Sequence, residues 1–238
     1  MLAASFLAIL VFPALQSSSP EIDYGRKSIG RYIESSKVFE RKMTYNYALN
    51  IIIGNRRQKM KPYLVHVVKQ GEPPQYGVIT NEEEEFSSRR VALSILAEWH
   101  DPSLIPLFLE FIIYPALDPN RPSTTDAKGR EPCEDYFAAV KGLINIGHSA
   151  LDPTLRELIK SDIPDEKNES LAPYTRASIR HRYNNLICVI WCILGYQGAK
   201  DYFIKEIEQL KSTDPKAAEK LNQALKYLEE NYRTKWNG

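Results

Sequence analysis

The chain contains 238 residues, of which 43% are hydrophobic and 26% are charged, a composition that is ordinary for a folded soluble protein. Its 31 Lys and Arg residues nearly balance its 30 Asp and Glu residues, so the formal net charge is only +1. A dedicated nucleic-acid-binding domain usually has a clear basic excess, so the charge argues against that class without excluding local basic patches.

An apolar segment opens the sequence. Residues 1–15 carry no charge and fit the apolar region of a signal peptide better than a membrane span. The basic residues that normally come first are missing, so three alternatives stay open: a start farther upstream, an unusual signal peptide, or an apolar helix of the fold. We expect residues 1–19 to be a signal peptide or an apolar N-terminal segment, and residues 20–238 to form a single domain. A genuine signal would make the protein exported, periplasmic or extracellular; otherwise it would be cytoplasmic. No transmembrane span is expected beyond an uncleaved N-terminal segment.

Three helices are predicted in the first hundred residues. They lie at about 21–35, where isoleucines recur at helical spacing, and within 47–68 and 82–99. Asn81 can cap the third helix, and the four glutamates that follow it lie at the positive end of the helix dipole. Composition predicts loops in three places: residues 71–77, 114–132 and 161–173.

A second apolar run follows the helix that ends near Trp99 with almost no linker. Asp101 can accept backbone N–H bonds at the start of the new helix, and Pro102 suits its first position. Residues 92–112 therefore predict a helical hairpin.

The same pattern recurs farther along the chain. Residues 139–159 repeat residues 92–112 at an offset of 47, with apolar positions and a proline in phase. Gly195 aligns with Gly147 at an offset of 48, which gives a third copy over residues 185–207. A glycine at this point suits a helix end that needs positive φ. The equivalent pairs are Ala92 and Ala139, Leu96 and Leu143, Leu104 and Leu151, Pro106 and Pro153, Phe108 and Leu155, and Glu110 and Glu157.

Weaker signals extend the pattern at both ends. Residues 47–68 form a poorer first copy with Gly54 at the turn. Asp214 and Pro215 begin a last helix whose apolar stripe would cover an exposed end of the array. The stripe consists of Ala217, Leu221, Leu225 and Leu228. An unrelated helical bundle is the alternative fold, but it would not be expected to keep phase over three copies.

A period of 46 to 48 residues with two helices in each unit resembles HEAT repeats, in particular the bacterial HEAT-like (PBS-lyase-type) repeats. The closest match is LINIGHSALDPTLREL at residues 143–158, and the resemblance covers roughly residues 37–211. It implies an all-α fold: a right-handed α-solenoid of about four HEAT-like hairpins with terminal capping helices. Long loops between the copies and the poor first copy depart from the family and leave the repeat number open.

No motif predicts catalysis or a cofactor. Two glycines in residues 142–147 have phosphate-loop spacing, but His148 and Ser149 follow where Lys and Ser or Thr are required. His181 and Cys192 lie on one helical face but roughly 16 Å apart along its axis, so one metal ion cannot bind both. The chain has three cysteines, Cys133, Cys188 and Cys192, and such a low, odd number does not indicate a framework of disulfide bonds. We expect Cys188 and Cys192 to be core residues, and we expect no bound metal and no enzymatic activity, with an enzyme of unfamiliar type as the open alternative.

Two groups of residues could form a binding edge. His100 and Asp101 occupy one hairpin turn and His148 occupies the next, although a histidine there also fits an ordinary turn. Basic residues and a tyrosine come just before the third copy, namely Arg180, Arg182 and Tyr183. A solenoid without catalytic motifs predicts a scaffold or adaptor whose partner is another protein.

The alternative function is a nucleic-acid-binding protein of the DNA-glycosylase type. Some HEAT-like proteins of similar length are DNA glycosylases with a basic concave groove, and interleaved Arg and Tyr side chains could serve such a surface. The near-zero net charge and the interrupted basic clusters make nucleic acid the less favoured partner. A continuous basic groove would favour nucleic acid, and a mixed or apolar groove would favour protein.

Overall fold

The computed structural model describes residues 57–70, 92–114, 137–164 and 170–232, together with positions 20, 22 and 89. All regular elements in this part of the chain are helical, which confirms the predicted all-α class there. The fully described elements are α3 (Arg57–Gln70), the 3-10 helix η2 (Pro102–Leu104), α5 (Ile105–Glu110), α7 (Ala138–Ile146), the 3-10 helix η3 (Gly147–Ala150), α8 (Leu151–Lys160), α9 (Pro173–Leu210) and α10 (Pro215–Tyr232). Residues 92–97 are helical as well.

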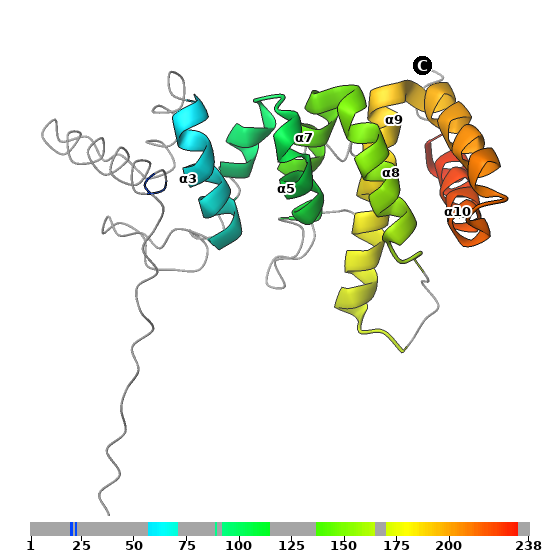
Figure 1. Ribbon diagram of the computed structural model, residues 1–238. Coiled ribbons are helices and arrows are strands. Elements are labelled where there is room, and N and C mark those ends of the chain that lie inside the picture. Colours follow the sequence, from blue (N-terminus) through cyan, green and yellow to red (C-terminus); the bar gives the residue numbers. More distant parts are fainter. Residues whose placement is uncertain are drawn as a thin grey trace, which may run out of the picture.

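The helices stand side by side in one row, from α3 at one end to α10 at the other (Figure 1). The long helix α9 contacts α7, α8 and α10, and α5 contacts α7 and α8. None of the described helices is both long and apolar enough to cross a membrane.

The first hairpin turns as its sequence predicts. Asp101 has an extended backbone, and its side chain accepts a hydrogen bond of 2.9 Å from the backbone N–H of Ser103. Pro102 follows at the start of η2, where its missing N–H costs nothing. The helix of residues 92–97 and α5 therefore lie on either side of a short capped turn.

The hairpin turns share one backbone feature. His100, Gly147 and Gly195 have φ values of 53°, 75° and 70°, and they are 47 and 48 residues apart. The ψ values of Gly147 and Gly195, −141° and 173°, complete a conformation that is almost confined to glycine. This confirms the predicted role of both glycines. Gly195 divides α9 into two helical segments. Gly54, the glycine of the weaker copy, lies outside the described residues.

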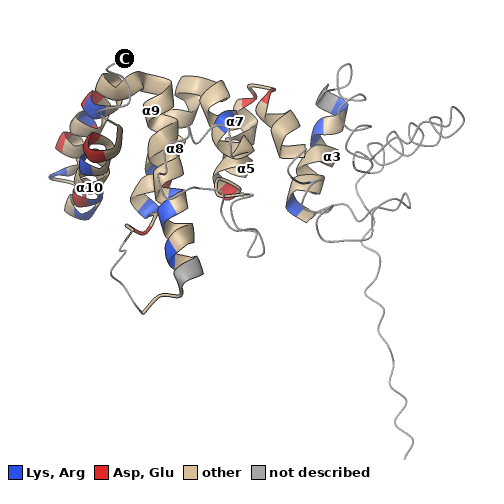
Figure 2. Cartoon of the chain, turned by 180° about the vertical axis from the view of Figure 1, so that it is seen from behind, with Lys and Arg blue, Asp and Glu red and all other residues tan. Residues whose placement is uncertain are grey.

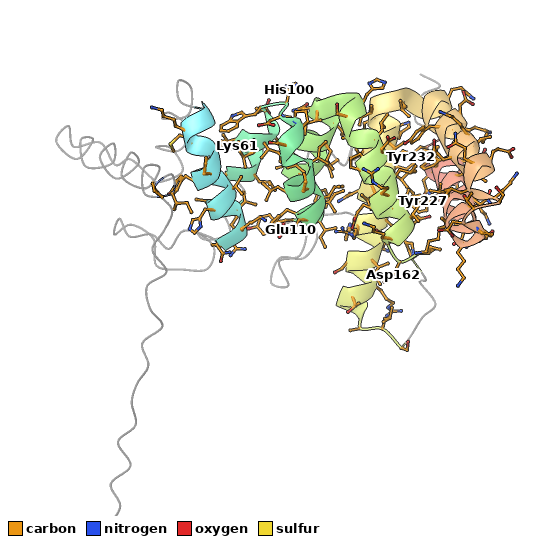
Figure 3. All side chains as sticks on the ribbon, in the orientation of Figure 1. Lys61, His100, Glu110, Asp162, Tyr227 and Tyr232 are labelled. Atoms are coloured by element: carbon orange, nitrogen blue, oxygen red, sulfur yellow. The ribbon has the colours of Figure 1, made fainter. Side chains whose placement is uncertain are left out.

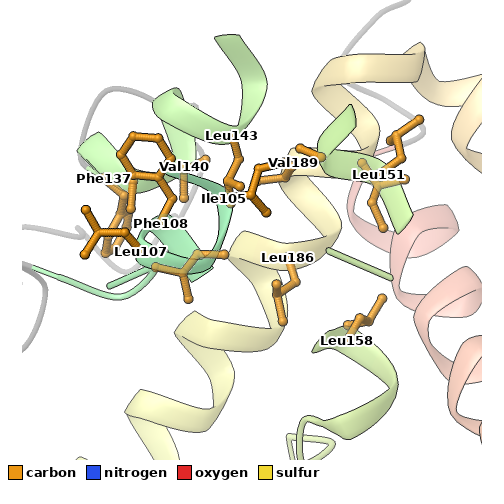
Figure 4. Close-up of a cluster of buried hydrophobic side chains, with 14 of the residues drawn as sticks. Ile105, Leu107, Phe108, Phe137, Val140, Leu143, Leu151, Leu158, Leu186 and Val189 are labelled. Atoms are coloured by element: carbon orange, nitrogen blue, oxygen red, sulfur yellow. The ribbon is translucent and has the colours of Figure 1, made fainter. Parts of the chain in front are cut away.

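The core consists of side chains from equivalent hairpin positions (Figure 4). Leu96 and Leu143 are both fully buried, as the alignment predicts. Trp191, their counterpart in the third copy, is half-buried against the core. Other equivalent positions are buried in all three copies: Ala92, Ala139 and Ile187; Leu104, Leu151 and Ala199; Phe108, Leu155 and Phe203.

Two helices approach closely at Gly142, which lies within α7. A Cβ atom at this position would come within 2.6 Å of the Phe108 ring of α5. The ring of Phe108 is fully buried, so it has little room to move aside. The requirement for glycine here is therefore one of packing and not of phosphate binding.

Polar side chains connect different hairpins and the last helix. Asn145 donates to the carbonyl of Ala97 at 2.9 Å, and Asn185 donates to the carbonyl of Ile112 at 2.8 Å. Lys220 donates to the carbonyls of Ile159 and Ser161 at 2.8 and 2.9 Å. Carbonyls at helix ends have no partner within the helix, so these bonds satisfy them and fix separate helices to one another. Ile112 and Ile159 are themselves equivalent positions.

The last helix covers the end of the row. In α10 the side chains of Ala217, Leu221 and Leu228 are buried and Leu225 is half-buried, which confirms the predicted stripe. Asp214 caps the helix by accepting a bond of 3.0 Å from the N–H of Ala217. The charged residues of α10 are of both signs (Figure 2).

Candidate functional site

A groove of about 580 Å³ lies between α5 and α8, the second helices of two successive hairpins. Its volume falls within the range of ligand-binding sites. It is lined by Pro102, Ile105, Pro106, Leu109, Glu110, Pro153, Arg156, Glu157, Lys160 and Arg182. Pro106 and Pro153 are equivalent positions of the two hairpins, so the groove follows the spacing between adjacent units.

The two walls of the groove differ in chemistry. The wall formed by η2 and α5 is apolar except at its end, because Pro102, Pro106 and Leu109 project there and Glu110 closes it. The α8 wall begins at Pro153 and continues with charged side chains. A ligand in the groove would therefore meet an apolar surface on one side and a charged surface on the other.

Arg182 connects the two walls from α9. Its guanidinium donates to the backbone carbonyl of Leu109 at 3.3 Å and forms an ion pair of 2.5 Å with Glu157. Both side chains of the ion pair are 27% exposed, so water screens the pair only in part. The arginine thus holds α5 and α8 at a defined separation and neutralises Glu157.

The remaining charge of the groove is positive. Arg156 and Lys160 are exposed on α8, and neither makes a hydrogen bond or ion pair with another described residue. Glu110 on the opposite wall has a cation of its own, Lys69, at 3.4 Å. The α8 wall therefore has two cations, one helical turn apart, that could each form an ion pair with a ligand.

The predicted binding edge consists of six residues, and the groove is lined by one of them, Arg182. His100 and His148 are exposed in hairpin turns, and Figure 3 places His100 and Glu110 at opposite ends of the first hairpin. Asp101 is held by Lys61 of α3, whose Nζ lies 2.6 Å from its Oδ2. The hydrogen bond from Lys61 lowers the pKa of Asp101. This carboxylate therefore already has a partner within the protein, on α3.

The other two predicted residues lie on α9. Arg180 is exposed, whereas Tyr183 is buried and makes an edge-to-face contact with Tyr227 at a centroid distance of 5.8 Å. Burial raises the pKa of Tyr183 well above its usual range. Its ring therefore belongs to the core and does not offer a surface on which a base could stack.

The environment of Glu157 differs from the prediction. The alignment paired it with Glu110 and predicted that both face water. The Glu110 side chain is 55% exposed, but Glu157 is half-buried because it pairs with Arg182. The groove cations Arg156 and Lys160 were also missed by the sequence analysis. Their spacing of four residues on a helix was a usable signal, but charged residues at that spacing are common on solvated helix faces.

Two of the cysteines and His181 lie on α9, and Cys133 lies outside the described residues. Cys188 is buried, Cys192 is half-buried, and their sulfur atoms lie 3.8 Å apart. His181 packs beside the ring of Phe137 at a centroid distance of 6.3 Å, and burial lowers its pKa, with the charge of Arg180 as a second cause. Within the described residues, no group of three or more His, Cys, Asp or Glu side chains could hold a metal ion.

No protein-family model, no curated protein and no solved structure matches this chain.

Proposed function

We propose that the chain is a right-handed HEAT-like α-solenoid of about four hairpins that acts as a non-catalytic scaffold or adaptor for another protein. The domain covers residues 20–238, with α10 as a capping helix. If residues 1–19 are a signal peptide, the scaffold works in the periplasm or outside the cell.

The spacing of equivalent positions supports the solenoid. Positive φ recurs at His100, Gly147 and Gly195, and the buried positions around each turn recur at the same offsets. Helices of adjoining units contact each other along the row, with α5 against α7 and α8 and with α7 and α8 against α9 (Figure 1), as the stacking of solenoid units requires. Hydrogen bonds from α9 to the carbonyls of Leu109 and Ile112 also reach the first hairpin, past the second.

The groove between α5 and α8 is the observation that supports binding to a protein. It combines an apolar wall with charges of both signs, as protein-binding surfaces often do. A nucleic-acid groove would instead present a continuous series of cations to the phosphates. The described groove has acidic side chains on both walls, Glu110 and Glu157, which disfavours that alternative.

Site-specific photocrosslinking in cells of the source organism tests this function. A benzophenone amino acid would replace Pro106 or Arg156 in the groove, with Lys205 and Lys216 as exposed control positions outside the groove. We expect a discrete protein adduct from the groove positions and none from the controls.

Two results would contradict the proposal. Nuclease-sensitive adducts would assign the groove to nucleic acid, and equal adducts from all four positions would show that the groove has no special role.

A further inference from the structure

We infer that the groove between α5 and α8 binds an extended acidic segment of a partner protein in which acidic and apolar residues alternate. This inference rests on the proposed function and adds the chemistry and conformation of the partner. The occupant would place carboxylates against Arg156 and Lys160 and apolar side chains against the α5 wall.

A comparison of equivalent positions shows that the cations are a local property of α8. Arg156 and Lys160 stand 47 residues after Leu109 and Ile113, so the preceding hairpin has apolar residues where α8 has cations. Leu109 and Ile113 are partly buried against the core, whereas Arg156 and Lys160 are exposed, so α8 projects cations where the preceding hairpin packs apolar side chains. The substitution turns a groove between similar helices into one with two chemically different walls.

The cations are free to act on a ligand. Glu157, which lies between them in the sequence, is occupied by Arg182, and Glu110 across the groove lies beside Lys69. Neither Arg156 nor Lys160 has a hydrogen-bonding or ion-pair partner among the described residues. A carboxylate entering the groove would therefore gain two cationic partners without having to displace an existing ion pair.

The spacing favours an extended occupant. Arg156 and Lys160 are four residues apart, which corresponds to roughly 6 Å along the axis of α8. Alternate residues of an extended chain are about 6.5–7 Å apart and project from the same face, whereas the residues between them project from the opposite face. One face of such a segment would meet the two cations while the other meets Pro106 and Leu109.

Fluorescence anisotropy with defined peptides tests the inference on the full chain. The probe is a fluorescein-labelled peptide of alternating Leu and Glu, and the matched peptides alternate Leu with Lys or Ser with Glu. The variants are the charge reversal Arg156→Glu with Lys160→Glu, and the control reversal Lys205→Glu with Lys216→Glu, which changes the net charge equally outside the groove. Circular dichroism verifies that both variants fold.

We expect the Leu–Glu peptide to bind the wild-type chain and to bind the groove variant about tenfold more weakly or worse, with less than about twofold change in the control variant. The groove variant should instead gain binding to the Leu–Lys peptide. The Ser–Glu peptide should bind more weakly than Leu–Glu, because it lacks the apolar face.

Other outcomes would overturn the inference. If the wild-type chain bound the Leu–Lys peptide but not the Leu–Glu peptide, the partner segment would be basic and not acidic. Equal weakening by the two reversals would mean that the attraction is not local to the groove. Failure of all peptides, together with a photocrosslinked protein at Pro106, would reject the acidic partner and leave the scaffold function in place.

Discussion

The hairpins of residues 92–112 and 139–159 share buried apolar positions and two groove positions, the prolines and the glutamates, but differ at the groove position held by Leu109 in one and Arg156 in the other. Leu96 and Leu143 are both fully buried, and three other apolar pairs are fully or almost fully buried: Ala92 and Ala139, Leu104 and Leu151, and Phe108 and Leu155. The groove positions Leu109 and Arg156 have opposite character, although they occupy the same place in their hairpins. Full burial thus goes with apolar side chains in both hairpins, whereas the partly buried Leu109 is replaced by the exposed Arg156 in the next unit.

This comparison also shows where two equivalent residues acquire different roles. Glu110 is largely exposed beside Lys69, whereas Glu157 is half-buried beside Arg182. The difference comes from the neighbouring unit, because α9 supplies Arg182 to Glu157 from outside the hairpin. The position of a residue within the repeat predicts which way its side chain points. Whether that side chain is exposed or half-buried depends on the helix that packs beside it.

The largest expected effect is on the buried pair. Leu96→Ala and Leu143→Ala should each lower the free energy of unfolding by about 2–5 kcal/mol, because both leave a cavity in a packed core. Urea denaturation of the two variants measures this. If one variant loses less than about 1 kcal/mol while the other falls in the expected range, the two positions are not equivalent and the comparison fails.

The turn glycines should show the next largest effect. Gly147→Ala and Gly195→Ala should each cost about 1–3 kcal/mol, since the backbone conformation there is strained for any residue with a Cβ atom. A Cβ at either position would have no atom within 4 Å, so the cost is one of conformation and not of collision.

His100→Gly is the matched test at the remaining equivalent turn, the first along the chain. Glycine adopts a positive φ without the strain that a Cβ atom causes, but it also has more conformational freedom in the unfolded chain. Because the two effects oppose each other, the free energy of unfolding should change by less than about 1 kcal/mol. Thermal melts of the three variants decide this. A loss at His100 as large as at the glycines would mean that the imidazole itself stabilises the turn.

The two glutamates should differ in the same experiment. Glu157→Ala should cost about 1–2 kcal/mol, because it leaves the half-buried Arg182 without its carboxylate. Glu110→Ala should cost about 0.5 kcal/mol or less, because the partner Lys69 is well exposed. A double-mutant cycle with Arg182→Ala isolates the contribution of the pair. Equal losses for the two glutamates would show that the partner on α9 makes no difference.

The sequence alone was sufficient for the helical class, the capped turn at Asp101 and the buried positions of the hairpins. These features depend on local hydrogen bonding and on the spacing of apolar residues, which are visible in one chain. The groove was not predictable in the same way. It depends on which side chains of α5, α8 and α9 meet, and neither the contact of Arg182 with Glu157 nor the burial of Tyr183 follows from helical spacing.

The smallest expected effect concerns His181, a half-buried histidine in the first segment of α9. Burial lowers its pKa below the ordinary value of 6.5, and the nearby charge of Arg180 acts in the same direction. The unfolded chain therefore binds a proton at a higher pH than the folded chain does, and the contribution of His181 to stability is lost as the pH falls below about 6.5.

Urea denaturation between pH 7 and pH 5.5 should reveal this loss, and His181→Gln should reduce the slope of stability against pH. Arg180→Gln should reduce it less, because burial is the larger cause and remains in that variant. An unchanged slope in His181→Gln would assign the pH dependence to other groups. A slope that disappears in Arg180→Gln would instead mean that charge repulsion, and not burial, controls the histidine. The two variants thus decide whether this region of α9 excludes a proton because of its packing or because of its surface charge.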